Sequence, residues 1–162
     1  MRPTALILLA IVALAGCSSP EETESQVGPS VEAYPREETE RMRQLMIGTW
    51  LGSRPYYGDA TVESLNKRYA DGTYELTFCI VMRGVVQDRW VEAGIWGVRK
   101  PVYFTATRRI VGEGRSINRN DASLYDAYYI DVLNESEFTY SSYASGNQFT
   151  VTRVKEGTAL AC

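Results

Sequence analysis

The chain has 162 residues, a formal net charge of −3, 23% charged residues and no histidine. The absence of histidine excludes Ser-His-Asp and Cys-His catalysis, and it removes the commonest ligand of transition metals. We therefore expect a protein that is not an enzyme and that holds no cofactor and no metal. Residues 41–162 are nearly neutral and have no basic stripe, so nucleic acid is not expected as a partner.

Residues 1–16 have the pattern of a secretory signal peptide. Arg2 precedes an apolar run over residues 5–14, and the small residues Ala15 and Gly16 follow it. The apolar run is about half as long as a membrane-spanning helix. We expect the signal peptide to be removed on export.

The segment Leu14-Ala15-Gly16-Cys17 resembles the bacterial lipobox, whose cysteine receives a diacylglyceryl group before cleavage. The resemblance implies a lipoprotein that is anchored in a membrane by acyl chains, such as palmitate, on Cys17. Ser18 stands where aspartate is the usual signal for the inner membrane, so the resemblance implies an outer membrane facing the periplasm in a Gram-negative source. The alternative is a signal peptide that merely contains a cysteine.

Residues 17–40 have the composition of a solvated tether. After Cys17 they hold seven acidic residues, one basic residue and three prolines. Such a segment cannot bury enough apolar surface to offset the chain entropy lost on folding. An acidic interaction tail is the alternative. Residues 41–162 then form one folded domain.

A short helix and eight β-strands are predicted next. Residues 36–46 combine helix formers with acidic residues in the first turn, which predicts a helix. Beyond it the chain shows β-rich runs divided by turn signals such as Asp71-Gly72. The longest predicted loop spans residues 112–123. The predicted strands cover residues 47–51, 60–69, 73–83, 86–97, 102–111, 124–133, 137–143 and 148–154.

Eight sequential strands with short turns predict an all-β fold, an eight-stranded antiparallel up-and-down β-barrel preceded by a short helix. Closure is favoured because it removes exposed strand edges. A barrel of this size either encloses one small ligand or is filled by its own side chains. A two-sheet sandwich is the alternative, since the number of strands does not decide closure.

The barrel resembles the lipocalin superfamily. Gly48-Thr49-Trp50 matches the Gly-x-Trp of the first lipocalin strand, whose tryptophan plugs the closed end of the barrel. Tyr125-Asp126-Ala127-Tyr128 is similar to the Tyr-Asp-x-Tyr of a second lipocalin signature. Arg153 stands where an arginine stacks on that tryptophan. The chain departs from lipocalins after the last strand, where it has no room for their helix.

Cys79 and Cys162 are expected to form a disulfide, because export leads to an oxidising compartment and lipid occupies Cys17. The large apolar residues of segment 74–82 share one strand face, which places Cys79 on the other face, within reach of a chain end. The lipocalin resemblance implies a similar bridge. Two free thiols are the alternative.

The leading hypothesis for function is a barrel that encloses a small apolar ligand at the membrane, because aromatic residues alternate along several strands. A dry core made of the same residues is the alternative. Oligomeric state is left open. The expected lining residues are Trp50 as the floor, Phe78, Ile80, Met82, Trp90, Phe104, Tyr140 and Phe149.

Two other functions remain open. Segment 142–149 is faintly similar to the loop of membrane-bound inhibitors of C-type lysozyme, with Phe149 in place of a tyrosine, which would imply a protein-binding surface. A structural envelope protein without a ligand is the other.

Charged residues could also supply chemistry. Asp126 with Asp131, and Asp88 with Glu92, are possible carboxylate pairs, but we expect them to be solvated charges on the outer face. We likewise expect plain surface charge from the arginines in and before the long loop, namely Arg108, Arg109, Arg115 and Arg119.

Overall fold

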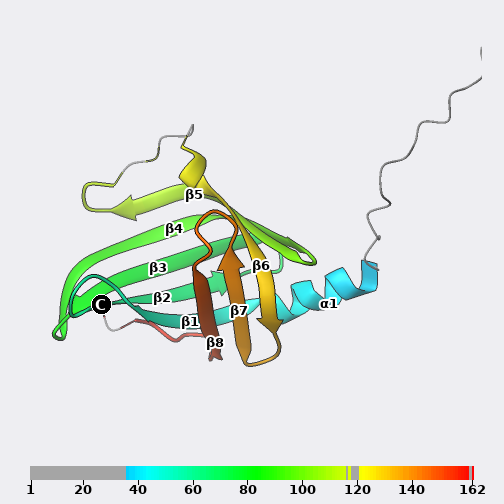
Figure 1. The fold of residues 1–162 in the computed structure, drawn as a ribbon, viewed down its shortest axis with the longest axis horizontal. Helices are drawn as coiled ribbons and strands as arrows, with labels where there is room; N and C mark the ends of the chain where they lie inside the picture. Colours follow the sequence, from blue (N-terminus) through cyan, green and yellow to red (C-terminus); the bar gives the residue numbers. More distant parts are fainter. Residues whose placement is uncertain (1–35, 116, 118–120, 161) are drawn as a thin grey trace, which may run out of the picture. The chain divides into compact units, whose positions relative to one another are not determined.

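The computed structural model describes residues 36–115, 117, 121–160 and 162. Residues 1–16, Cys17 and the tether up to residue 35 lie outside this part of the chain, so the predictions made for them stay predictions. The described helices are α1 (Arg36–Met46) and the 3-10 helix η1 (Ala122–Leu124) (Figure 1). The strands are β1 (Gly48–Pro55), β2 (Ala60–Arg68), β3 (Thr73–Met82), β4 (Val85–Arg99), β5 (Val102–Gly112), β6 (Tyr125–Leu133), β7 (Glu137–Ser142) and β8 (Gln148–Val154).

The eight strands close into an antiparallel barrel in chain order, with β1 paired to β8. The predicted up-and-down barrel is confirmed, and the two-sheet sandwich is wrong. The main difference from the predicted strands is that β1 runs on past Leu51 to Pro55. Gly52 faces inward here, and a Cβ on it would lie 2.7 Å from Ser64 Oγ. The glycine therefore permits close packing inside the barrel and does not end the strand.

Helix α1 covers the barrel end at which β1 begins. Arg43 in its last turn donates a hydrogen bond of 2.5 Å to the carbonyl of Ala70, which lies in the turn between β2 and β3. Lys100, in the turn between β4 and β5, pairs with Glu38 at 2.7 Å. The helix is thus joined to two turns at one end of the barrel. It begins at Arg36, five residues before the domain boundary expected at residue 41.

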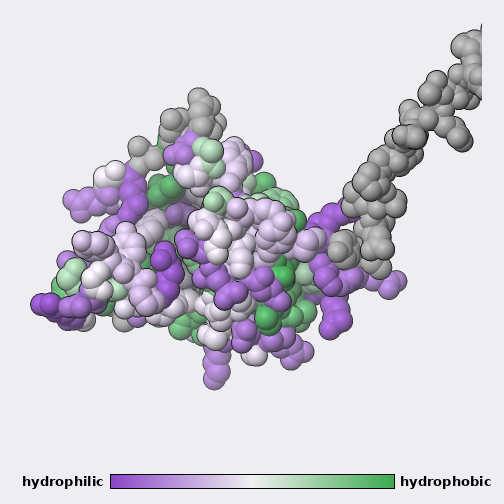
Figure 2. Space-filling model, in the orientation of Figure 1, coloured by the Kyte–Doolittle hydropathy of each residue, from purple (hydrophilic) through white to green (hydrophobic). Residues whose placement is uncertain are grey.

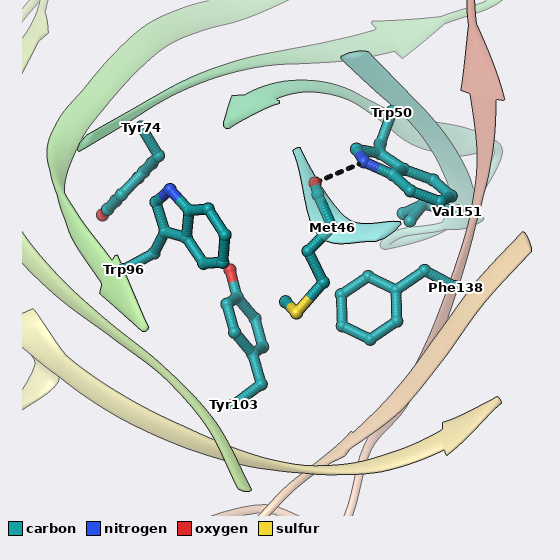
Figure 3. Packing of buried hydrophobic residues seen from close by; sticks show 7 residues of the cluster. All are labelled: Met46, Trp50, Tyr74, Trp96, Tyr103, Phe138 and Val151. Carbon is teal, nitrogen blue, oxygen red and sulfur yellow. Dashed lines mark hydrogen bonds between the residues drawn. The ribbon is translucent and has the colours of Figure 1, made fainter. Parts of the chain in front are cut away.

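A largely aromatic cluster fills the barrel beneath α1, and we call this the closed end (Figure 3). Trp50 is fully buried there. Its indole N–H donates a 2.9 Å hydrogen bond to the carbonyl of Met46, one of the last carbonyls of the helix. Trp50 therefore connects α1 to the barrel. The buried members of the cluster are Met46, Trp50, Tyr74, Trp96, Tyr103, Phe138 and Val151.

Arg153 completes the closed end from the last strand. Its guanidinium carbon lies 4.2 Å from the centre of the Trp50 ring, which is the predicted stacking contact. Gly48 has a φ of 121°, and a Cβ on it would lie 2.5 Å from Arg153 Nη1. Glycine is therefore required where β1 meets the arginine. The guanidinium donates hydrogen bonds to the backbone carbonyls of Leu45, Ile47 and Glu135.

The ladder between β5 and β6 is short. These strands pair only over Val102–Ala106 of β5, and the rest of β5 pairs with β4. Beyond the pairing, η1 lies against β5 and buries Leu124. The Asp121 side chain caps this turn by accepting a 2.8 Å hydrogen bond from the Ser123 N–H. The last residues of the predicted loop over residues 112–123 therefore belong to η1, which packs against the barrel wall.

The C-terminal residues lie against the outside of β2 and β3. Cys79 points to the outer face, as its strand position predicted, yet it is fully buried. Cys79 and Cys162 form a disulfide, with their Cα atoms 6.3 Å apart. The predicted pairing is confirmed, and it holds the chain end on the barrel wall.

The visible surface is mostly hydrophilic, with hydrophobic residues in smaller groups between the polar ones (Figure 2). Two exposed tyrosines, Tyr129 and Tyr143, also stack on each other, with ring centres 3.7 Å apart. Within the described part of the chain, no helix has the length and apolar character needed to cross a membrane.

Candidate functional site

Beyond the closed end, the barrel interior contains two cavities. The first, which we call the acidic chamber, has a volume of about 330 Å³ and lies among β2 to β7 and η1. The second, the β8 chamber, has a volume of about 280 Å³ and is bordered by β1, β2 and β8. Because they share lining residues, we treat them as one lumen. The shared residues are Asn66, Leu76, Phe78, Tyr128 and Tyr140.

A larger hollow of about 620 Å³ lies outside the lumen, where Lys67 and Tyr69 approach Glu156 and Gly157. Its lining is mainly exposed or half-buried. The lumen is the stronger candidate site, because buried polar groups from several strands converge on it.

Two carboxylates, Glu92 and Asp126, line the acidic chamber. Glu92 pairs in register with Leu76, and Asp126 with Thr105, so all four lie on the inner face. Glu92 Oε1 accepts a 2.9 Å hydrogen bond from the indole N–H of Trp90. Neither carboxylate forms an ion pair with a described residue. Acids without a counter-charge in a partly buried site are unfavourable for folding and point to a functional role.

Burial dominates the ionisation of both acids. It raises the pKa of Glu92, and the nearby charge of Asp126 adds to the rise, while the Trp90 hydrogen bond and Arg115 oppose it. Burial also raises the pKa of Asp126, partly offset by hydrogen bonding to Tyr128. A positive charge in the chamber would favour the ionised form of both groups.

Tyrosines supply much of the remaining wall. The rings of Tyr103 and Tyr128 stack with centres 5.3 Å apart, and Tyr140 meets Tyr128 edge-on at 5.0 Å. The Tyr74 hydroxyl shares a 2.6 Å hydrogen bond with Thr107 Oγ1. Burial raises the pKa values of Tyr74, Tyr128 and Tyr140 well above the ordinary tyrosine value. These side chains therefore remain neutral hydroxyls, able to accept or donate hydrogen bonds.

Two buried polar atoms have no hydrogen-bond partner among the described residues, namely Asn66 Oδ1 in the lumen and Arg68 Nη1, whose residue borders the outer hollow. Asn66 is only 6% exposed and lines both chambers. Arg68 lies over the rings of Tyr103 and Phe138, and its Nη2 donates a 3.1 Å hydrogen bond to the Tyr103 hydroxyl. Folded interiors rarely leave such atoms unpaired. The Asn66 oxygen is therefore free to accept a hydrogen bond from a molecule in the lumen.

An aromatic pair on β3 and β4 lies beside the acidic chamber. Phe78 and Trp90 stack with ring centres 4.6 Å apart. The guanidinium carbon of Arg115 lies 4.0 Å from the centre of the Trp90 ring, and the guanidinium forms an ion pair with Asp88. The register places Asp88, Trp90 and Glu92 opposite inward residues of β3, so the even spacing correctly predicted a shared face for the two acids.

The other arginines differ in their surroundings. Arg108 and Arg109 are exposed, as predicted, whereas Arg115 is held by its acidic and aromatic neighbours. Arg119 lies outside the described residues. Arg54, which was not singled out from the sequence, lies 5.8 Å over the ring of Phe149 in the β8 chamber.

Most of the residues predicted to line a ligand site face inward. Phe78 and Tyr140 line both chambers, and Phe149 lines the β8 chamber. Ile80 follows Phe78 on the inner face, toward the turn between β3 and β4. Met82 continues this face at the end of β3, where it is 38% exposed.

Trp50 and Phe104 lie elsewhere. Trp50 packs in the closed-end cluster and borders neither chamber. The inward placement predicted for Phe104 is wrong, because its ring is exposed and covers Gly97 on the outer face. Adjacent strand residues point to opposite faces, so Tyr103 takes the inward position.

The expectation that the carboxylates are solvated on the outer face is wrong for Glu92 and Asp126, and Asp88 also lies on the inner face. It is correct for Asp131, which accepts hydrogen bonds at the surface from neighbouring side chains. The available signal was the aromatic residue two positions away on the same face, Trp90 for Glu92 and Tyr128 for Asp126. Tyr125 of the same motif is exposed.

A scan against protein-family models finds no match for this chain, and a search of curated proteins finds none either. Function must therefore be inferred from the lumen. In the described ranges, no group of three or more acidic or cysteine side chains is placed to hold a metal ion. The lumen offers hydrogen-bond acceptors, aromatic faces and the volume for a small molecule.

Proposed function

We propose that this protein is a non-catalytic binding module whose barrel takes up one small amphipathic molecule. The observation that carries the proposal is the lumen, two neighbouring chambers that share lining residues inside a closed barrel. Small-molecule sites are concave and largely apolar, with a few polar groups that fix orientation. The β8 chamber supplies apolar surface from Val62, Phe149 and Val151, and the acidic chamber supplies the polar groups.

The lining favours an amphipathic ligand over the wholly apolar one expected from the aromatic pattern. An apolar molecule in the acidic chamber would leave the Asn66 oxygen without a partner and would give Glu92 and Asp126 none beyond Trp90 and Tyr128. Each buried polar group left unpaired costs about 1–3 kcal/mol. A ligand that places its polar end there and its apolar end in the β8 chamber avoids this loss.

Filling the lumen should abolish binding. Leu76 borders both chambers, so Leu76→Trp is expected to weaken binding of 3-phenylpropanol at least about tenfold, because the larger ring occupies the ligand volume. Binding is measured by calorimetry on the lipidated full chain in non-ionic detergent, with the titration of detergent alone subtracted. Val111→Trp, on the exposed outer face of β5, is the matched control and should bind like the wild type. Equal binding by the Leu76 variant would refute a site in the lumen.

We propose further that Cys17 anchors the protein to the periplasmic face of an outer membrane. The lipobox-like sequence before Cys17 and the acidic stretch after it support this proposal. Cells fed labelled palmitate should incorporate it into the wild-type chain, and Cys17→Ser should lose the label and leave the membrane fraction. Ser18→Ala is the control and should keep both. Label retained by the Cys17 variant would contradict the anchor.

The lumen supports ligand binding better than it supports the two alternatives. A lysozyme-inhibitor-like loop would present residue 149 to a partner, but the Phe149 ring faces inward and stacks on Tyr140 at 5.3 Å. A purely structural barrel of this size would be filled by its side chains, as the closed end is. Beyond the closed end the interior is open.

A further inference from the structure

The wall of the acidic chamber includes oxygens that only accept hydrogen bonds when the acids are ionised. Glu92 and Asp126 enter from β4 and β6, and Asn66 brings an unpaired carbonyl oxygen from β2. The indole N–H of Trp90 donates to Glu92, and the Tyr128 side chain hydrogen-bonds to Asp126. A ligand that satisfies this wall must donate hydrogen bonds, and two carboxylates favour a donor that carries positive charge.

We propose that the acidic chamber binds the ammonium group of a small amphipathic amine, between Glu92 and Asp126, while the apolar part of the amine lies in the β8 chamber. This inference rests on the proposed function, since it names the ligand class of the same lumen. The tyrosine rings add attraction, because the face of an aromatic ring is electron-rich and stabilises a nearby cation.

The basic groups around the lumen form no ion pair with the two acids. Arg54, in the wall of the β8 chamber, lies over the ring of Phe149. Arg115 pairs with Asp88 and stacks on Trp90, and its effect on Glu92 ranks below the effects of burial and Asp126. Arg68 lies over Tyr103, toward the closed end, and forms no ion pair with either acid. The uncharged titratable neighbours are tyrosines that stay protonated. When ionised, the two acids therefore have no ion-pair partner among the described residues and attract a cation.

The test compares three probes of one shape, 3-phenylpropylammonium, 3-phenylpropanol and 3-phenylpropanoate, by calorimetry on the lipidated full chain in non-ionic detergent. The ammonium probe should bind at least about tenfold more tightly than the alcohol, and the carboxylate more weakly than the alcohol. Glu92→Gln and Asp126→Asn should each reduce the preference for ammonium about tenfold. Asp131→Asn, on the outer face of the same strand as Asp126, should leave it unchanged.

The pH dependence gives a second measure. An alkylammonium stays charged from about pH 4 to pH 8. Because burial raises the pKa values of Glu92 and Asp126, affinity for the ammonium probe should be full above those values and should fall as the pH drops through them. Affinity for the alcohol should not change. Loss of the negative charge of Glu92 or Asp126 should not destabilise the fold at neutral pH, because burial disfavours that charge.

The outcomes separate the two proposals. If the alcohol or the carboxylate binds as tightly as the ammonium probe, or if Asp131→Asn removes the preference as fully as Asp126→Asn, the cation site is refuted and the lumen remains a binding site. If none of the three probes binds, both proposals are refuted. An ammonium preference that depends on Glu92 and Asp126 and follows pH supports both.

Discussion

Replacement of Trp50 by alanine is expected to lower the free energy of unfolding by about 3–5 kcal/mol, the usual range for truncating a large buried aromatic side chain. Trp50 is fully buried, it donates to the Met46 carbonyl, and it supports the guanidinium of Arg153. Its loss opens a cavity and leaves a carbonyl of α1 unpaired. Urea denaturation followed by far-ultraviolet circular dichroism measures the change.

Trp50→Phe is the matched variant, because it keeps an aromatic ring in the cluster and removes the indole N–H. We expect a smaller loss, with about 1 kcal/mol coming from the hydrogen bond. A loss below about 1 kcal/mol for Trp50→Ala would show that the closed end does not depend on this side chain.

Opening the bridge between Cys79 and Cys162 should destabilise the protein by about 4 kcal/mol in the loop-entropy model, since the cysteines are 83 residues apart in sequence. Cys162→Ala is the better variant, because Cys79 is fully buried and its truncation would also change packing. The measurement is the urea midpoint with and without reductant.

Reductant is the internal control for this prediction. It should lower the midpoint of the wild-type chain to that of Cys162→Ala and leave the variant unchanged. An unchanged wild-type midpoint, with reduction verified by thiol titration, would contradict a stabilising role for the bridge.

The fold could be predicted from the sequence because the local patterns for helix, strands and turns all fit one closed barrel. The helix over residues 36–46 and the turn at Asp71-Gly72 follow from local chemistry, and strands in sequence with short turns have few alternatives to a barrel. Gly48 and Trp50 could be located because the Gly-x-Trp motif places a glycine two residues before the tryptophan that fills the closed end of the barrel. Strand ends were less certain, since Gly52 resembles a turn residue although it is an inward packing position.

The candidate site was harder to predict because period-two alternation separates two faces without saying which is inside. Tyr103 and Phe104 are adjacent aromatic residues, and either could have faced the lumen. A register shift between β4 and β5 then places both Thr107 and Ile110 inside, an odd spacing that alternation does not allow. Glu92 and Asp126 were assigned to solvent by their charge, although their aromatic neighbours indicated the inner face.

The stacking of Arg153 on Trp50 has a consequence for the order of folding. Arg153 donates hydrogen bonds to carbonyls 106 and 108 residues earlier in the chain. The end of the barrel formed by the amino-terminal helix and the first strand is therefore complete only when the last strand is in place. Contacts this distant in sequence make folding slow, on the order of milliseconds to seconds. Because β1 pairs with β8, the barrel cannot close before the last strand is available.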